Sequence, residues 1–300
     1  MKFCFNSRSF VIQIPAVEFY NQIIRMKTQY ESSKIVVFES ALYRTTSTVI
    51  VLNNSVIIVD PNWLPHEIDY IRTFVTSNYP AHKQYILFTH SDYDHIIGYG
   101  AFPDATTFAS KAFHENPEKS TILQQITEFD NEFYISRPYK VTFPDINIVI
   151  NEDYQTITID QTDLIFYLAD GHTNDGIFVC IPSLSVWIAG DYLSNIEIPI
   201  IEHNYSAYMN TIRKAATIYE KHTDISLLIT GHGDLATNRD EIKKRIELDM
   251  QYLQNLRLPT DGDEDSDAFK IIKTYSDNPN LIKAHEMNKI KVKAADITDK

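Results

Sequence analysis

The sequence lacks several features that would place it among secreted, membrane or nucleic-acid-binding proteins. It contains only two cysteines, Cys4 and Cys180, which excludes a framework of disulfides. No apolar run is long enough to cross a membrane. Cationic residues are a minority, because 27 Lys and Arg stand against 40 Asp and Glu, giving a net charge of −13. This balance argues against a nucleic-acid surface or an anionic membrane as the partner.

The N-terminal residues also lack the continuous apolar stretch that is typical of a secretory signal. With so few cysteines, the sequence indicates a reduced, cytoplasmic protein. Cys180 lies inside the apolar run 177–181 and is predicted to be a core residue. We expect a small-molecule substrate as the partner, and the sequence leaves the formation of homo-oligomers open.

The length of 300 residues is enough for one large domain. Residues 1–32 are interpreted as an N-terminal arm with a strand at 10–14 and a helix at 17–30. The pattern then changes to short apolar runs that predict strands, with helical spacing between them. This first half has predicted strands at 35–38, 47–52, 56–59, 85–88 and 106–109, a helix at 65–79, and a mainly helical stretch at 110–134 broken at Pro117.

The second half is predicted to begin near residue 140 and to repeat the order of strands followed by helices. Its predicted strands are 146–150, 156–159, 164–168, 177–181, 186–189 and 227–229, and its helices are 206–222 and 238–257. Two β-rich halves of this kind predict an α/β fold in which the sheets face each other and helices cover the outside. The predicted domain spans residues 33–260, and residues 261–300 are interpreted as an acidic linker and a helical tail.

One stretch, THSDYDHIIG at residues 89–98, concentrates side chains that bind metals. In an extended segment His90 and Asp92 point the same way and can reach one ion. Asp94 and His95 are adjacent, so they diverge towards a second ion. An alternative is that Asp94 only caps a following helix, but capping does not account for two histidines.

Five predicted apolar strands end on an aspartate or a histidine. Binding sites commonly gather beyond the carboxyl ends of strands, so these endings point to one shared site. Glycines beside them fit sharp turns that aim the next side chain over the sheet edge. The five endings are Asp60, the His90–His95 cluster, Asp170-Gly171-His172, Gly190-Asp191 and Gly231-His232-Gly233-Asp234.

These side chains can be sorted into two sets of ligands. His90, Asp92 and His172 would hold one metal, and Asp94, His95 and His232 would hold the other. Asp191 can bridge the two ions, because a carboxylate has two oxygens. Mixed imidazole and carboxylate ligands suit zinc, iron or manganese. The sequence therefore predicts two divalent metal ions as cofactors, with zinc favoured and iron or manganese as alternatives.

The order of these motifs resembles the metallo-β-lactamase fold superfamily over roughly residues 33–257. The motifs are Asp60, HxxxDH at 90–95, GHT at 171–173, GD at 190–191 and GHG at 231–233. The resemblance implies a four-layer αββα sandwich with a dinuclear metal site at one edge of the two sheets. It also implies that Asp60 orients the site without binding metal.

The resemblance further implies a hydrolase in which Asp94 and Asp191 belong to the catalytic centre. A hydroxide between two metals would attack an ester, thioester, lactone, amide or phosphodiester. Asp191 stands where the main class of β-lactamases carries cysteine, which favours hydrolases whose metals are bridged by aspartate.

The chain departs from the family at Asp92, where the family pattern has histidine, and at Ile97, where glycine is usual. Asp92 can bind through oxygen or can leave its metal weakly held, which would give a one-metal protein. In the flavodiiron branch the same position is also a carboxylate, so a diiron redox or oxygen-binding protein is the alternative function.

His203 lies with Tyr192 and Glu202 in the loop after Asp191, which places His203 within reach of a substrate in this interpretation. A solvated loop is the competing interpretation. The other histidines, at 66, 82, 114, 222 and 285, stand in polar surroundings and are predicted to lie on the surface.

Overall fold

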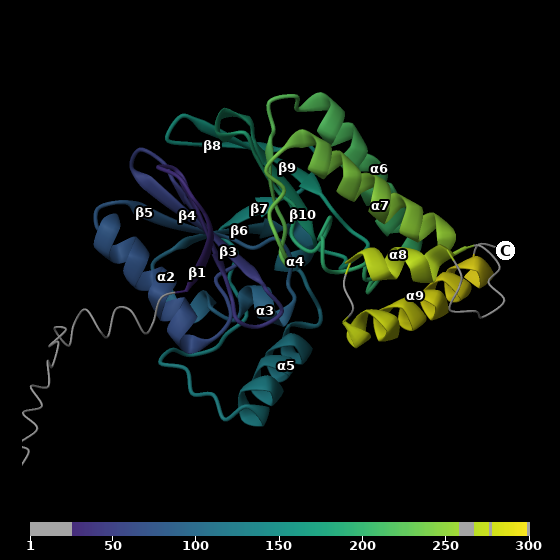
Figure 1. The fold of residues 1–300 in the computed structure, drawn as a ribbon. Helices are drawn as coiled ribbons and strands as arrows, with labels where there is room; N and C mark the ends of the chain where they lie inside the picture. Colours follow the sequence, from purple (N-terminus) through teal and green to yellow (C-terminus); the bar gives the residue numbers. More distant parts are fainter. Residues whose placement is uncertain (1–25, 258–266, 276–277, 299–300) are drawn as a thin grey trace, which may run out of the picture.

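The computed structural model describes residues 26–257, 267–275 and 278–298. Two sheets pack face to face, and helices cover the outer face of each (Figure 1). The four-layer αββα sandwich predicted from the sequence is confirmed. One sheet has the strand order β1-β2-β3-β4-β5-β6-β7, and the other has the order β12-β11-β10-β9-β8.

The first sheet changes from antiparallel to parallel pairing at its centre. Its antiparallel part runs from β1 to β4, and β4, β5, β6 and β7 pair in parallel. The strands are β1 (Lys27–Glu31), β2 (Ile35–Glu39), β3 (Thr46–Val51), β4 (Ser55–Val59), β5 (Lys83–Leu87), β6 (Thr106–Ser110) and β7 (Ile148–Ile150). The helical segments among them are α2 (Pro65–Asn78), α3 (Tyr93–Ile96), η1 (Tyr99–Ala101), α4 (Lys111–His114) and α5 (Lys119–Glu132).

The second sheet is formed by later parts of the chain and is covered by the last helices. Its strands are β8 (Thr156–Ile159), β9 (Thr162–Leu168), β10 (Ile177–Ile181), β11 (Val186–Ile188) and β12 (Leu227–Ile229). The helical segments are η2 (Pro182–Leu184), α6 (Tyr205–Lys221), α7 (Arg239–Asn255), α8 (Asp267–Tyr275) and α9 (Pro279–Thr298). Only β11 and β12 pair in parallel in this sheet.

The core consists of three apolar layers, because successive side chains of a strand point to opposite faces. In β4, Val56 and Ile58 pack towards α2, whereas Ile57 and Val59 pack between the two sheets. In β10, Cys180 packs with residues of α6 and α7 and is fully buried. The prediction that Cys180 is a core residue is confirmed. Strands buried on both faces, like β4 and β10, lack the polar alternation of a solvent-facing sheet.

The structure corrects two predicted elements. The helix predicted over 17–30 is wrong for residues 27–30, which form β1 and pair with β2, since pairing with a distant segment overrides local helical spacing. Residues 27–31 of the predicted N-terminal arm therefore belong to the sheet, and the predicted strand at 10–14 lies outside the described residues. The strand predicted at 146–150 pairs in parallel with β6, so it belongs to the first sheet and not to the second half.

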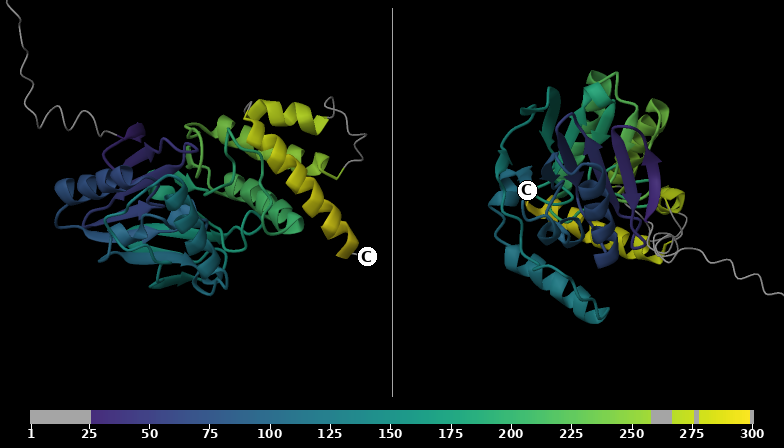
Figure 2. Two further views of the ribbon diagram at one scale, coloured as in Figure 1. Left: turned by 90° about the horizontal axis from the view of Figure 1, so that it is seen from below. Right: turned by 90° about the vertical axis from the view of Figure 1, so that its left-hand side faces the viewer.

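The two C-terminal helices pack against α6 and α7 at one end of the molecule (Figures 1 and 2). Ile272, Leu281 and Val292 are buried in the same apolar layer as α6 and α7. His285 is buried as well and contacts the Tyr252 hydroxyl through Nδ1, so its predicted surface position is wrong. Among the described residues, no helix is both long and apolar enough to span a membrane. The domain boundaries stay a prediction.

Candidate metal centre

The predicted strand endings meet at one edge of the sandwich. Because β4 and β5 are parallel neighbours, Asp60 and Thr89 emerge side by side, and the Thr89 amide donates to Asp60 Oδ1 at 2.9 Å. β11 and β12 are also parallel neighbours, and they bring Gly190 next to Gly231 in the same way. The Thr46 amide donates to the Gly231 carbonyl at 2.7 Å and joins the two sheet edges.

The seven predicted ligands lie together in two groups. One consists of His90, Asp92, His172 and Asp191, and the other consists of Asp94, His95 and His232. Within each group the potential ligand atoms are all within 4.8 Å of one another. The structure thus brings together the same two sets that the sequence predicts, and their role as metal ligands stays a prediction.

Asp191 lies between the two groups. Its Oδ1 is 3.1 Å from His95 Nε2, and its Oδ2 is 3.3 Å from His232 Nε2. The same Oδ2 is 3.4 Å from His172 Nε2 and 3.5 Å from His90 Nε2. These separations are close to the roughly 3.0–3.4 Å expected between ligand atoms that share a metal with bonds of about 2.1 Å. Asp191 therefore has the position of a bridge.

All four histidines present Nε2 to the cluster and use Nδ1 for a contact with the surrounding protein. His90 Nδ1 is 2.9 Å from the Thr89 hydroxyl, and His95 Nδ1 is 3.0 Å from Asp60 Oδ2. His172 Nδ1 is 2.8 Å from the Ile200 carbonyl, and His232 Nδ1 is 3.0 Å from the Tyr43 carbonyl. An imidazole that donates from Nδ1 keeps the Nε2 lone pair for a metal.

Asp60 supports two of these imidazoles. It is buried, it accepts from the Thr89 hydroxyl at 2.6 Å, and it contacts His95 directly. Because Thr89 donates to Asp60, its oxygen is left to accept from His90. Asp60 belongs to neither ligand group among the described residues. Its contacts fit the predicted role of orienting the site.

The acid–base properties of the cluster follow from close opposite charges. Burial lowers the pKa of the His90 imidazole, and the charge of His95 lowers it further. The carboxylates of Asp191 and Asp92 outweigh both effects and raise that pKa to about 9. Burial likewise lowers the pKa of His232, but Asp191 raises it to about 10. A metal ion competes with these protons for the imidazole lone pairs, so metal binding strengthens as pH rises.

Three buried atoms in the cluster have no hydrogen-bond partner: His90 Nε2, His95 Nε2 and Asp191 Oδ1. Buried polar atoms nearly always have partners, so such a concentration of orphaned atoms calls for an explanation. A cation bound between them would satisfy all three. The donor set of imidazole nitrogens and carboxylate oxygens fits zinc, iron or manganese.

Gly231 is required by the close approach of Asp191. A Cβ added at residue 231 would overlap with Asp191 Oδ1 and would come within 2.9 Å of His95 Cε1. Gly190, directly before Asp191, has a φ of 53°, which favours glycine. The predicted sharp turns are confirmed by positive φ at Gly190, Gly171 (127°) and Gly233 (90°), whereas Gly231 is needed for the close approach of Asp191.

The alternative that Asp94 is only a helix cap is wrong, because Asp94 lies within α3. Asp92 occupies the position before the helix, yet its side chain makes no capping hydrogen bond there. Its Oδ2 instead lies 3.2 Å from His172 Nε2 and 3.5 Å from His90 Nε2. Asp92 is thus turned towards the cluster.

A cavity of about 310 Å³ opens beside Asp92. Its walls include Glu118 and Thr121 at α5, and Glu202 and His203 from the loop before α6. Both loop residues are exposed, so the predicted reach of His203 towards a substrate is geometrically available. Tyr192 is different, because it is buried and its hydroxyl contacts the His172 amide and the Ala169 carbonyl. It is not among the residues that line this cavity.

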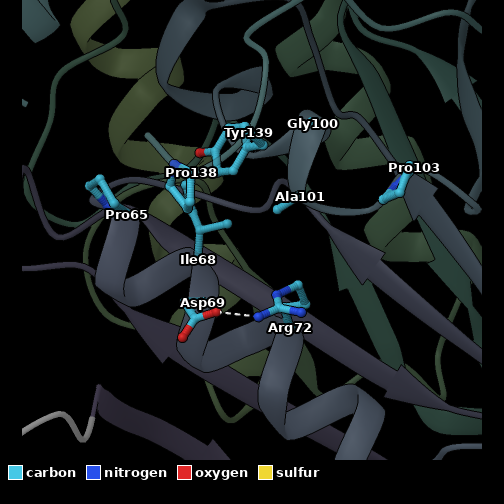
Figure 3. Close-up of a pocket in the computed structure, with 9 residues that line it drawn as sticks. All are labelled: Pro65, Ile68, Asp69, Arg72, Gly100, Ala101, Pro103, Pro138 and Tyr139. Carbon is cyan, nitrogen blue, oxygen red and sulfur yellow. Dashed lines mark hydrogen bonds and ion pairs between the residues drawn. The ribbon is translucent and has the colours of Figure 1, made fainter. Parts of the chain in front are cut away.

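A second cavity, of about 430 Å³, lies between α2, η1 and the segment around Tyr139 (Figure 3). None of its lining residues belongs to the ligand groups. Its two charged residues, Asp69 and Arg72, form an ion pair with each other at 2.5 Å. This second cavity is therefore separate from the predicted metal ligands.

Several contacts of the centre have no equivalent among the residues singled out in the sequence. The carbonyls of Tyr43 and Ile200 and the hydroxyl of Thr89 all hold histidines. Thr89 could have been found, since it directly precedes His90. The two carbonyls could not, because every residue carries one and only the fold decides which carbonyl meets an imidazole.

The sequence model of the Metallo-beta-lactamase superfamily matches residues 42–249. Among solved structures, a metallo-beta-lactamase from Pontibacter korlensis superposes with a TM-score of 0.52 at 14% identity, over 77% of this chain and 100% of that one. A metallo-beta-lactamase family protein from Thermus thermophilus gives 0.55 at 15% identity, over 75% of this chain and 81% of that one. A stereoselective inverting sec-alkylsulfatase from Pseudomonas sp. gives 0.59 at 15% identity, over 77% of this chain but only 42% of that one. At 14–15% identity, these superpositions show a shared fold alone.

Proposed function

The chain belongs to the metallo-β-lactamase superfamily, and on that premise we propose that it is a hydrolase that works with two divalent metal ions. Members of the superfamily are metal-dependent hydrolases. The observation that carries the proposal is the pair of ligand groups joined by Asp191 at the edge of the sandwich. The matches described above lend no support to the diiron alternative.

In this proposal His90, Asp92 and His172 hold one ion, Asp94, His95 and His232 hold the other, and Asp191 contacts both. When bound, the ions would supply a water that is deprotonated near neutral pH and a Lewis acid for the scissile group. Zinc is favoured by the four imidazoles, with iron or manganese as alternatives.

The protein residues keep the site ordered for that chemistry. Asp60 and the carbonyls of Ile200 and Tyr43 accept from Nδ1 of His95, His172 and His232, and they hold these three rings with Nε2 inwards. Five of the seven predicted ligands are buried, His90, Asp94, His95, His172 and His232, and the cavity opens beside Asp92. Asp92 lies at that opening, since 26% of its side chain is exposed against 9% for Asp191.

The cavity also bears on the substrate. Three carboxylates line it, from Asp92, Glu118 and Glu202, and neither lysine nor arginine is among its lining residues. In the loaded centre, the carboxylates of Asp92, Asp94 and Asp191 would offset most of the charge of two divalent ions. The centre would then be close to neutral, so Glu118 and Glu202 give the cavity a negative potential. We therefore propose an uncharged or cationic ester, thioester, lactone or amide as the substrate. The sulfate ester suggested by the alkylsulfatase neighbour fits these walls poorly.

The test combines metal content with a panel of substrates. Metal-replete protein should contain about two ions per chain and should hydrolyse at least one uncharged or cationic ester, thioester or lactone faster than a phosphodiester or a sulfate ester. Asp191→Asn should lose both metal and activity. The control Asp69→Asn removes a carboxylate charge from the surface of α2 and should retain both. Full metal content and activity in Asp191→Asn, or no metal in the native protein, would overturn the proposal.

A further inference from the structure

Helix α9 lies beyond residues 42–249, which the superfamily matches, yet it contacts the loop that supports a predicted ligand. It packs beside α6, and the views agree that it lies against the end of the molecule formed by α6 and α7 (Figures 1 and 2). Among the described side chains of this helix, the most buried polar residue is Asn288, of which 1% is exposed. Its side-chain hydrogen bonds to Ile201, Pro199 and Tyr252 all leave its own helix.

The side chain of Asn288 forms hydrogen bonds with the backbone on both sides of Ile200. Its Oδ1 accepts from the Ile201 amide at 2.9 Å, and its Nδ2 donates to the Pro199 carbonyl at 2.6 Å. The same Nδ2 donates to the Tyr252 hydroxyl of α7 at 3.0 Å, which fixes the orientation of the side-chain amide. Two opposed hydrogen bonds to neighbouring peptide groups leave the loop little freedom to rotate between them.

The Ile201 amide and the Ile200 carbonyl are the two ends of one peptide group. That carbonyl accepts from His172 Nδ1 at 2.8 Å. A continuous chain of hydrogen bonds therefore runs from Asn288 through this peptide group to His172. Since a peptide N–H that donates makes its carbonyl a better acceptor, the bond to Asn288 strengthens the bond to His172.

A second contact ties α9 to the same loop. Lys291, one turn after Asn288, donates from Nζ to the Glu202 carbonyl at 2.6 Å, and the Glu202 amide donates to the His172 carbonyl at 3.0 Å. His172 thus meets the loop at two backbone groups, the Ile200 carbonyl and the Glu202 amide, and both are connected to α9.

We propose that Asn288 is a positioning residue for His172, so that the C-terminal helix forms part of the scaffold of the metal centre. The proposal rests on the proposed function in one respect, because it takes His172 to be a metal ligand. Asn288 acts by fixing the peptide group that holds Nδ1, which keeps Nε2 directed at the cluster. Residues that support a ligand in this way typically change metal affinity by about 10- to 100-fold when they are replaced.

The test compares Asn288→Leu, which removes the three hydrogen bonds and keeps the number of side-chain heavy atoms, with Val292→Ala. Val292 is buried one turn later on α9 and has no polar side chain, so its truncation weakens the packing of α9 and leaves the hydrogen bonds of Asn288 in place. Zinc affinity of both sites is measured by competition with a chelator on the full chain. Asn288→Leu should weaken one of the two sites by about tenfold and leave the other unchanged, whereas Val292→Ala should change neither.

A second measurement separates this proposal from the proposed function. In protein labelled with ¹⁵N-histidine, the Nδ1 proton of His172 should exchange slowly in the native protein and in Val292→Ala, and rapidly in Asn288→Leu. Asn288→Ala serves in both assays if the leucine variant does not fold. Slow exchange and two unchanged zinc sites in the Asn288 variant would overturn the role of Asn288. A native protein that binds no zinc would overturn the proposed function, while the exchange of the His172 proton still decides whether Asn288 holds the ring.

Discussion

Replacing Asp92 by histidine tests the position at which this chain departs from its superfamily. Asp92 is predicted to bind the ion shared with His90 and His172, and its Oδ2 lies 3.5 Å and 3.2 Å from their Nε2 atoms. An anionic oxygen gives its metal more charge than a neutral imidazole does, so the water on that metal holds its proton more tightly. Asp92→His should therefore lower the pKa of that water.

The size of the effect follows from the position of Asp92 in the site. A unit charge about 4 Å from the water contributes about 1 kcal/mol in a water-like surrounding and about 4 kcal/mol at an effective dielectric constant near 20. The lower figure applies, because 26% of the Asp92 side chain is exposed and two divalent ions screen it. This corresponds to about one pKa unit.

The assay combines pH–rate profiles with competition between zinc, iron(II) and manganese(II). In Asp92→His the acidic limb of the profile should move down by about one pH unit, and zinc should gain over iron and manganese, because imidazole is a softer ligand than carboxylate. Asp92→Asn is the matched control, since it removes the charge without adding an imidazole. If Asp92→Asn keeps its metal, the acidic limb of its pH–rate profile should move down in the same way. Its preference for zinc over iron and manganese should not increase.

An unmoved acidic limb together with an unchanged metal preference in Asp92→His would refute this reasoning. Asp92 would then not contact a metal. The centre would have to be redrawn around a single ion at Asp94, His95 and His232.

Three further predictions concern the surroundings of the centre. Asp60→Asn removes the carboxylate that supports His90 and His95, so chelator competition should show both zinc sites weakened by about 10- to 100-fold, and unchanged sites would exclude its orienting role. Asp249 is buried in α7 and accepts from the amide of Leu193, two residues after Asp191, at 3.2 Å. Burial raises the pKa of its carboxyl from 3.8 to about 7, so its contribution to stability is complete below about pH 4 and is lost as pH rises to about 7. In urea unfolding of metal-free protein, the difference in free energy between wild type and Asp249→Asn should fall by up to about 4 kcal/mol across that range, and a constant difference would contradict the shift. Glu202→Gln should reduce the preference for 4-(trimethylammonio)phenyl acetate over the isosteric 4-tert-butylphenyl acetate by about two- to fivefold in kcat/KM, and an unchanged ratio would remove Glu202 from the substrate cavity.

The clustering of the predicted ligands could be foreseen from the sequence, because side-chain type and strand endings carry the signal together. Apolar runs are visible without a structure, and a histidine or aspartate directly after such a run is placed at a sheet edge whichever way the sheet is ordered. The assignment of Asp92 and Asp94 to different ligand groups could also be predicted, because the alternation of side chains along an extended segment is a local property.

Long-range pairing set the limit of that reasoning. Residues 27–30 have helical spacing, yet they become a strand because β2 offers an edge to pair with. Residues 148–150 follow a long helical stretch and look like the start of a new half, yet they extend the first sheet beside β6. In both cases the partner strand, and not the local pattern, decides the outcome.

The imidazole contacts show how closely the centre depends on the packing of the two sheets. His232 follows a strand of the second sheet, but its Nδ1 reaches the Tyr43 carbonyl and the Thr45 hydroxyl of the segment before β3 in the first. His95 lies in α3, which follows β5 of the first sheet, and it contacts Asp191, which follows β11 of the second. A metal ion bound among these residues would therefore join the sheets as well as the ligands. Because the unfolded chain cannot present this arrangement, the free energy of metal binding would add to the free energy of unfolding.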